Sequence, residues 1–271
     1  AEEVLSERFN REYARLTANG TTALYLALKY AREVLGAEKV FFPEITCQAA
    51  VNSAILNGCA IGVVDVERNH FIVRDSMFET GKCEPSVFVK TDIFGFPTGD
   101  ADLGQFPSDT FVVEDKAQGF FTNVSTASSQ ATILSFGRGK HIDIGTGGAL
   151  LFDSSELAAF VDSQLKLMPE SLSLNNAEFY TALFELQKKY SGDRFRQERN
   201  LLIRGHKWQF IGRFAAEREK ELVSALQSAD RTYDLKIENQ YRLEKEMAAV
   251  RGIQTHLFKE HLCWRYPVLT D

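Results

Sequence analysis

The first half of the chain combines two patterns of apolar positions. Apolar residues recur with helical spacing over residues 21–35, which predicts an amphipathic helix opened by the polar run 19–22. A second helix is predicted over residues 46–56, ended by Asn57 and Gly58. Short apolar runs between and after them predict buried strands at residues 40–43, 60–65, 87–89, 111–113, 131–136 and 149–152.

This alternation of strands and helices predicts the fold class. It favours an α/β protein with a mostly parallel sheet and helices on both faces. In such sheets ligands bind beyond the carboxyl ends of the strands. Asp115 and Ser135 follow two of the predicted strands, so both are expected at that edge.

The second half of the chain is helical and charged. Helical periodicity is predicted over residues 157–167, 177–190 and 215–249. Within the last run, a long helix across Leu222, Leu226 and Tyr233 towards Leu243 is expected to link the sheet to the C-terminal residues. Residues 253–258 and 262–269 are predicted to be strands. We therefore expect a large domain over residues 1–220, then a linker helix and a small, shortened α+β domain over 221–271.

Composition excludes several classes of protein. The 271 residues are 44% apolar, enough for a large core, and the net charge of -6 argues against a general nucleic-acid binder. No apolar run is long enough to cross a bilayer, and the first residues do not resemble a signal peptide. The four cysteines lack metal-ligand spacing and are expected to be reduced thiols. We predict a soluble cytoplasmic protein without a metal site.

Three reactive groups follow neighbouring predicted strands. Asp115 ends the run 110–115, and Ser135 ends the next apolar run, with Lys140 five residues later and a glycine turn at residues 145–148. A carboxylate, a hydroxyl and an amine placed in this way could bind pyridoxal phosphate. The amine would form the Schiff base, the carboxylate would keep the pyridine nitrogen protonated, and the hydroxyl would hold the phosphate.

The start of the first predicted helix is a second candidate for the phosphate. The backbone amides of Thr21 and Thr22 open that helix, where unpaired N–H groups and the helix dipole favour an anion. Either threonine could instead only cap the helix. The coincidence with Lys140 favours the phosphate.

Six motifs in order resemble the DegT/StrS family of sugar aminotransferases, which belong to fold type I of the pyridoxal phosphate enzymes. The similarity covers the first 153 residues and, more faintly, residues 221–269. The motifs are Asn-Gly-Thr-Thr-Ala-Leu at 19–24, Pro-Glu-Ile-Thr-Cys at 43–47, Val-Val-Asp-Val-Glu at 63–67, Ile-Phe-Gly-Phe-Pro at 93–97, Glu-Asp-Lys-Ala-Gln at 114–118, and the stretch from Ser135 to Lys140 with its glycine turn.

The resemblance implies a role for each matched residue. Lys140 would carry the cofactor and shuttle the proton, Asp115 would pair with the pyridine nitrogen, and Gln118 would lie near the ring. Phosphate would be bound by Ser135 and by the two threonines at the helix start. The implied reaction transfers an amino group from an amino acid, expected to be glutamate, to a nucleotide-linked keto-sugar in a homodimer.

Two alternatives stay open beside this interpretation. The same fold and cofactor could serve another substrate or reaction, or the chain could be a degenerate member that binds a ligand without turnover. Lys140 argues against the second alternative and against the family's sugar dehydratases, which carry histidine at that position. An oxidoreductase of the Rossmann type is disfavoured because no G-x-G-x-x-G follows a strand.

Several positions depart from the family pattern. Cys47 stands where an aromatic ring stacks on the cofactor, and Lys116 replaces a small residue beside Asp115. The family's intersubunit asparagine has no match, because Gly212 lies nearest in register. Residues 175–207 form an insertion without a counterpart. Arg265, in a predicted strand, is a candidate clamp for a substrate carboxylate and equally suits a half-exposed strand position.

Overall fold

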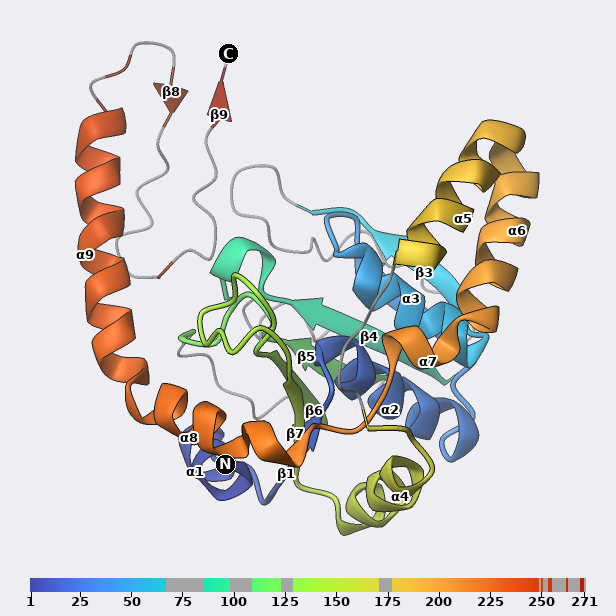
Figure 1. Cartoon of the computed structure of the whole chain (residues 1–271), viewed down its shortest axis with the longest axis horizontal. Helices are drawn as coiled ribbons and strands as arrows, with labels where there is room; N and C mark the ends of the chain where they lie inside the picture. Colours follow the sequence, from blue (N-terminus) through green and yellow to red (C-terminus); the bar gives the residue numbers. More distant parts are fainter. Residues whose placement is uncertain are drawn as a thin grey trace.

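The computed structural model describes residues 1–66, 85–97, 109–122, 129–170, 177–248, 250, 253–254, 262 and 269–270. Its main body is a seven-stranded sheet with helices on both faces (Figure 1). Five adjacent strands run parallel, and only β7 is antiparallel to both of its neighbours. The strand order across the sheet is β1 (Tyr13–Thr17), β7 (Gly148–Phe152), β6 (Ala131–Ser135), β5 (Phe111–Asp115), β4 (Ser86–Thr91), β2 (Lys39–Pro43) and β3 (Ala60–Val64). The predicted α/β fold is confirmed.

The two helices predicted in the first half are present, with ends within about two residues of those expected. Helix α2 (Gly20–Glu33) begins at the cap Asn19, whose side chain accepts a hydrogen bond from the Thr22 amide. Helix α3 (Gln48–Asn57) ends at Gly58, whose φ of 69° is a left-handed conformation that suits glycine. Most residues of α2 are buried, because the helix lies across β7, β6 and β5.

Apolar side chains cover both faces of the sheet. On one face α2, α3 and α4 (Ser155–Lys166) contribute to a core with Val87, Val89, Val113 and Ile133 of the central strands. On the other face a second core is built by α1 (Glu2–Phe9) and α8 (Glu219–Gln227) against the alternate residues of the strands, including Leu134, Ala149 and Leu151. The sheet is therefore the middle of three layers. The helices cover its two faces and leave the ends of its strands at the margin of the sheet.

The long helix predicted in the second half of the chain is divided. The single helix expected over residues 215–249 is a 3-10 turn, η4 (Ala216–Arg218), followed by α8 and α9 (Ala229–Met247). The break falls at Ser228, whose hydroxyl donates to the carbonyl oxygens of Ser224 and Ala225. Such side-chain bonds compete with the helical backbone pattern and favour a helix end.

The insertion predicted at residues 175–207 folds as helices in its described part. Helix α5 (Ala177–Lys189) was expected, whereas α6 (Gly192–Gly205) was not, and α7 (Lys207–Phe210) follows it. The α5–α6 pair stands at one end of the molecule beside α3 (Figure 1). Helix α1 and strand β1 were also missed by the sequence analysis.

The described part of the C-terminal region is small. Strands β8 (Ile253–Gln254) and β9 (Leu269–Thr270) pair in an antiparallel two-stranded sheet. The first lies at the start of the predicted strand 253–258, and the second at the end of the predicted strand 262–269. The division into domains at residue 220 stays a prediction. Cys47 and Cys59 are free thiols, while Cys83, Cys263 and Arg265 lie outside the described residues. Within the described ranges, no helix is both long and apolar enough to span a membrane.

Candidate functional site

The carboxyl ends of the parallel strands bring the predicted site residues to one edge of the sheet. Thr91 of β4 is paired with Asp115 of β5, and Ser135 of β6 is paired with Gly148, where β7 begins. Gly148 is also paired with Thr17, the last residue of β1, so the start of α2 lies at the same edge. We call Asp115, Ser135, Lys140 and the first turn of α2 the sheet-edge site.

Asp115 and Ser135 lie on the face of the sheet that α2 covers. Side chains alternate along a strand, and Val113 and Ile133, two residues earlier in each strand, pack in the core beneath α2. The residues between them, such as Glu114 and Leu134, therefore face the opposite side. The carboxylate, the hydroxyl and the helix start thus share one face at one edge.

Asp115 is a buried carboxylate at the tip of β5. Its side chain is 5% exposed, and Oδ1 accepts a hydrogen bond from the Ala117 amide at 3.0 Å. Burial raises the pKa of Asp115, while the Ala117 amide and the charge of Lys140 lower it. A buried carboxyl group is stabilised as an anion mainly by a nearby cation, so this position suits a positively charged ligand group.

Lys140 lies in the loop between β6 and β7, close enough for its charge to act on Asp115. Its amide donates to the Gly137 carbonyl at 3.1 Å. The loop is held by Asp143, whose carboxylate accepts from the amides of Gly139 at 2.6 Å and Gly145 at 2.7 Å. Both glycines have positive φ, 79° and 77°, so the turn needs residues without a β carbon. The structure therefore places the predicted amine in a loop at the same sheet edge as the predicted carboxylate.

The start of α2 makes a close contact with the ends of β6 and β7. A β carbon on Gly20 would lie 3.0 Å from Cβ of Ser135, and one on Gly148 would lie 2.5 Å from the Gly20 nitrogen. Only glycine fits at Gly148, because the clashing atoms belong to the backbone. The Ser135 hydroxyl is consequently held next to the first turn of α2, where the helix dipole attracts an anion.

The two threonines at the start of α2 have different surroundings. The Thr22 amide donates to Asn19 Oδ1 at 2.8 Å, and the Thr22 hydroxyl accepts from the Gly212 amide at 3.1 Å. Thr22 is fully buried, and the residue that caps α2 is Asn19 rather than either threonine, so the alternative that a threonine caps this helix is wrong. Thr21 is half-buried, and its carbonyl accepts from the Ser53 hydroxyl at 3.0 Å. Of the two predicted phosphate ligands, Thr21 is the more accessible.

Gln118 is held in the turn that follows β5. Its Oε1 accepts from the Phe94 amide at 2.9 Å, and its own carbonyl oxygen lies 3.0 Å from Nε2 of His141. Phe94 has a φ of 56°, which is uncommon for a residue with a side chain. The amide oxygen of Gln118 thus binds protein backbone, and the predicted contact with a cofactor ring stays a prediction that would use the amide nitrogen.

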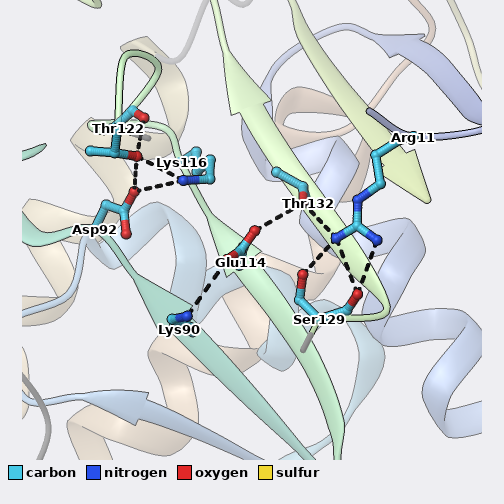
Figure 2. A network of polar contacts seen from close by, with 9 residues as sticks. Arg11, Lys90, Asp92, Glu114, Lys116, Thr122, Ser129 and Thr132 are labelled. Carbon is cyan, nitrogen blue, oxygen red and sulfur yellow. Dashed lines mark hydrogen bonds and ion pairs between the residues drawn. The ribbon is translucent and has the colours of Figure 1, made fainter. Parts of the chain in front are cut away.

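Lys116, the residue after Asp115, is held in a buried ion pair (Figure 2). Its Nζ lies 3.2 Å from Asp92 Oδ2 and 2.7 Å from the Thr122 hydroxyl, which is itself 2.6 Å from Asp92. A β carbon on Gly119 would lie 2.6 Å from Cβ of Asp92. The turn over residues 116–122 therefore wraps closely around Asp92.

A second buried ionic network lies on the face of the sheet opposite Asp115 (Figure 2). Lys90 lies 3.6 Å from Glu114, Glu114 accepts from the Thr132 hydroxyl at 3.2 Å, and the Arg11 guanidinium contacts both Thr132 and Ser129. Burial raises the pKa of Glu114, which Lys116 and Lys90 partly oppose. The network joins β4, β5 and β6 beneath the site, and so stabilises the strands that carry Asp115 and Ser135.

Sequence reasoning missed Asp92, His141 and Asp143. Asp143 had a local signal, since an aspartate two residues before a glycine favours a turn. Asp92 and His141 had none, because their partners are 24 and 23 residues distant in sequence.

Comparison with known proteins gives one family. The family model described as the DegT/DnrJ/EryC1/StrS aminotransferase family matches residues 1–271. No curated protein sequence matches the chain.

Solved structures show the same fold at low sequence identity. An E. coli GDP-4-keto-6-deoxy-D-mannose-3-dehydratase with bound hydrated PLP is 14% identical, with a TM-score of 0.73 over 100% of this chain and 70% of that chain. The sugar aminotransferase CalS13 from Micromonospora echinospora is 18% identical, with a TM-score of 0.67 over 98% and 70%.

A third solved structure matches a shorter part. It is a mutant GDP-4-keto-6-deoxymannose-3-dehydratase with bound GDP-perosamine, 17% identical, with a TM-score of 0.53. That match covers 59% of this chain and 45% of the dehydratase, so the chain matches less than half of that relative's length.

Proposed function

The chain belongs to the DegT/DnrJ/EryC1/StrS aminotransferase family, whose members depend on pyridoxal phosphate, and we propose that its sheet-edge site binds this cofactor and transfers an amino group. One observation carries the proposal: the buried Asp115 carboxyl group ends β5 at the same sheet edge as Ser135, the loop that carries Lys140 and the first turn of α2. An amine, a buried carboxylate and an anion-binding helix start are the groups that bind pyridoxal phosphate.

The described residues fit pyridoxal phosphate. Asp115 is a buried anion suited to a protonated ring nitrogen, and the Gly20 and Gly148 contacts bring Ser135 beside a helix start suited to a phosphate. Lys140 supplies the amine. The chain does not have the family's aromatic ring at Cys47, so stacking on the cofactor must come from another residue.

When bound, pyridoxal phosphate supplies an electron sink that stabilises negative charge next to the reacting nitrogen. Each residue then has a distinct task. Lys140 would hold the cofactor through Nζ, and the same amine would accept and return a proton. Asp115 keeps a proton on the ring nitrogen by its negative charge. Ser135 and the half-buried first turn of α2 anchor the phosphate and so orient the ring.

For the substrates we propose an amino acid donor, expected to be glutamate, and a nucleotide-linked keto-sugar acceptor. The support is family membership, together with relatives named as a sugar aminotransferase and as a dehydratase with bound GDP-perosamine. Lys140 stands at the position of the family's reactive lysine, which also favours amino transfer over a site that only binds a ligand.

Discharge of the aminated cofactor tests the substrate class. Protein loaded with pyridoxamine phosphate should react faster with a nucleotide-linked keto-sugar than with pyruvate or oxaloacetate. Fast reaction with small keto acids and none with any keto-sugar would favour the alternative, an enzyme of the same fold acting on amino acids. Loading without reaction toward either class would favour a binding protein without turnover.

We also propose a homodimer, as the family resemblance implies. Sites of this fold type are completed by a second subunit, and the family's asparagine for that contact has no match here. Sedimentation at working concentration tests the dimer. A monomer that turns over would contradict a shared site.

A further inference from the structure

His141 directly follows Lys140 and is held from two sides. Its side chain is 5% exposed, its Nε2 lies 3.0 Å from the Gln118 carbonyl oxygen, and its ring packs edge-on against Phe121 with 5.2 Å between centroids. The His141 carbonyl accepts a hydrogen bond from Nζ of Lys236 in α9 at 3.1 Å. The residue next to the reactive amine is thus tied both to the turn after β5 and to α9.

The His141 ring is neutral at physiological pH. Burial, followed by the charge of Lys236, lowers its pKa to about 4, with a further decrease from Lys140. A neutral ring carries one N–H, and a carbonyl oxygen can only accept, so the proton is on Nε2 and is donated to Gln118. Within the described part of the chain, Nδ1 has no hydrogen-bond partner.

The carbonyl that accepts this bond belongs to a rigid turn. Residues 116–122 are fixed to the end of β4 by the Lys116–Asp92 ion pair and by Thr122 (Figure 2). Gln118 is fixed again by its Oε1, which accepts from the Phe94 amide at 2.9 Å. The same turn directly follows Asp115, whose carboxylate accepts a hydrogen bond from the Ala117 amide within the turn.

We propose that His141 is a positioning residue that sets the place of Lys140 relative to Asp115 through its Nε2–H bond to Gln118. A single cofactor ring must reach both Lys140 and Asp115, so an error of about 1 Å between them would slow attachment. The inference rests on the proposed function, because the spacing matters only if one cofactor bridges the two groups.

The experiment compares variants of His141 in the full chain. Apo protein is mixed with pyridoxal phosphate, the visible band of the lysine-bound cofactor is followed over time, and the adduct is fixed with borohydride and quantified at Lys140. His141→Phe keeps the aromatic packing and removes the N–H donor. His141→Gln places an amide N–H near the position of Nε2. The side chain in His141→Asn is one methylene shorter, so its N–H cannot reach the Gln118 carbonyl oxygen.

A matched control is available at His206. Its Nδ1 lies 2.9 Å from the Leu202 carbonyl oxygen, and its ring, between α6 and α7, packs edge-on against Phe179 with 5.8 Å between centroids. His206→Phe therefore removes a similar bond elsewhere. If the control slows attachment as much as His141→Phe does, the effect is general destabilisation and the proposal is wrong.

We expect attachment to slow about three- to tenfold in His141→Phe, the effect of one net hydrogen bond, and to recover in His141→Gln. If His141→Phe fails to fold, the comparison of Gln with Asn decides, because the proposal requires Gln to attach faster. Equal rates in both, or a wild-type rate in a folded His141→Phe, would overturn it. A wild-type protein that forms no Lys140 adduct would refute the proposed function itself and the inference with it.

A second readout needs no cofactor. Nitrogen NMR of the labelled apo protein should show His141 neutral at pH 7 with its proton on Nε2, and His141→Gln should leave the remaining histidines unchanged. A proton on Nδ1 would contradict the bond to Gln118 and the proposal.

Discussion

Gly20 and Ser135 meet where helix α2 begins and strand β6 ends: a β carbon on Gly20 would lie 3.0 Å from Cβ of Ser135. This contact brings a hydroxyl to a helix N-terminus, and the neighbouring Gly148 allows it by leaving room for the backbone of residues 19 and 20. The anion-binding part of the proposed site is therefore a consequence of close backbone packing.

Gly148→Ala should disturb this packing. The added carbon would lie 2.5 Å from the Gly20 nitrogen, so backbone must move, and we expect a loss of about 1–3 kcal/mol in the free energy of unfolding. Affinity for pyridoxal phosphate should also fall. Urea denaturation and cofactor titration measure both. The control is Gly205→Ala, where no atom of the described neighbours lies within 4 Å and no loss is expected; equal affinity in Gly148→Ala would contradict the role of this contact.

Asn19→Ala should remove the cap of α2. Loss of a capping side chain costs about 1 kcal/mol, and here the freed first turn is also part of the proposed phosphate site. Ser154→Ala is the matched control, since Ser154 caps α4 through the Leu157 amide in the same way. Asn19→Ala should lose more stability than Ser154→Ala, because it also removes the bond that Asn19 Nδ2 donates to the Phe210 carbonyl oxygen, and only Asn19→Ala should weaken cofactor binding. A similar effect on the cofactor from Ser154→Ala would show that binding follows global stability alone.

Asp115→Asn should keep the fold and weaken the cofactor site. The amide can still accept from the Ala117 amide, yet it has no charge for a protonated ring nitrogen. A lost charge-assisted hydrogen bond predicts roughly ten- to hundredfold weaker binding of pyridoxal phosphate and a larger loss of amino-transfer rate. Asp162→Asn, which removes a partly exposed partner of Arg15, serves as control. Wild-type affinity and rate in Asp115→Asn would refute its role.

Stability should depend on pH through Glu114. Burial raises its pKa above the unfolded value near 4.5, so the folded chain holds this proton more tightly than the unfolded chain does. The stabilisation that Glu114 provides through this proton is therefore fully present below the unfolded pKa, and it is lost as pH rises through the folded pKa. The free energy of unfolding of the wild type, minus that of Glu114→Gln, should fall across this window. Urea denaturation from pH 4 upward tests the sign, and a rising difference would contradict it.

The sequence predicted those parts of the molecule that depend on local pattern. Strand β5 with Asp115 and the loop carrying Lys140 were found because apolar runs and glycine turns are local signals. The break at Ser228 was missed because it depends on one hydroxyl bonding to backbone. Arg11 and its contact with Ser129, 118 residues distant, could not be found in this way. The order of the strands in the sheet determines which distant residues meet, and the spacing of residues along the chain does not reveal that order.

The most direct test of the account is to locate the bound cofactor. The purified protein is incubated with pyridoxal phosphate, reduced with borohydride, digested and mapped by mass spectrometry, with Lys140→Arg as the control. We expect one adduct, on Lys140, which is absent from the control. An adduct on another lysine, or none when the cofactor is present, would contradict the assignment of the sheet-edge site.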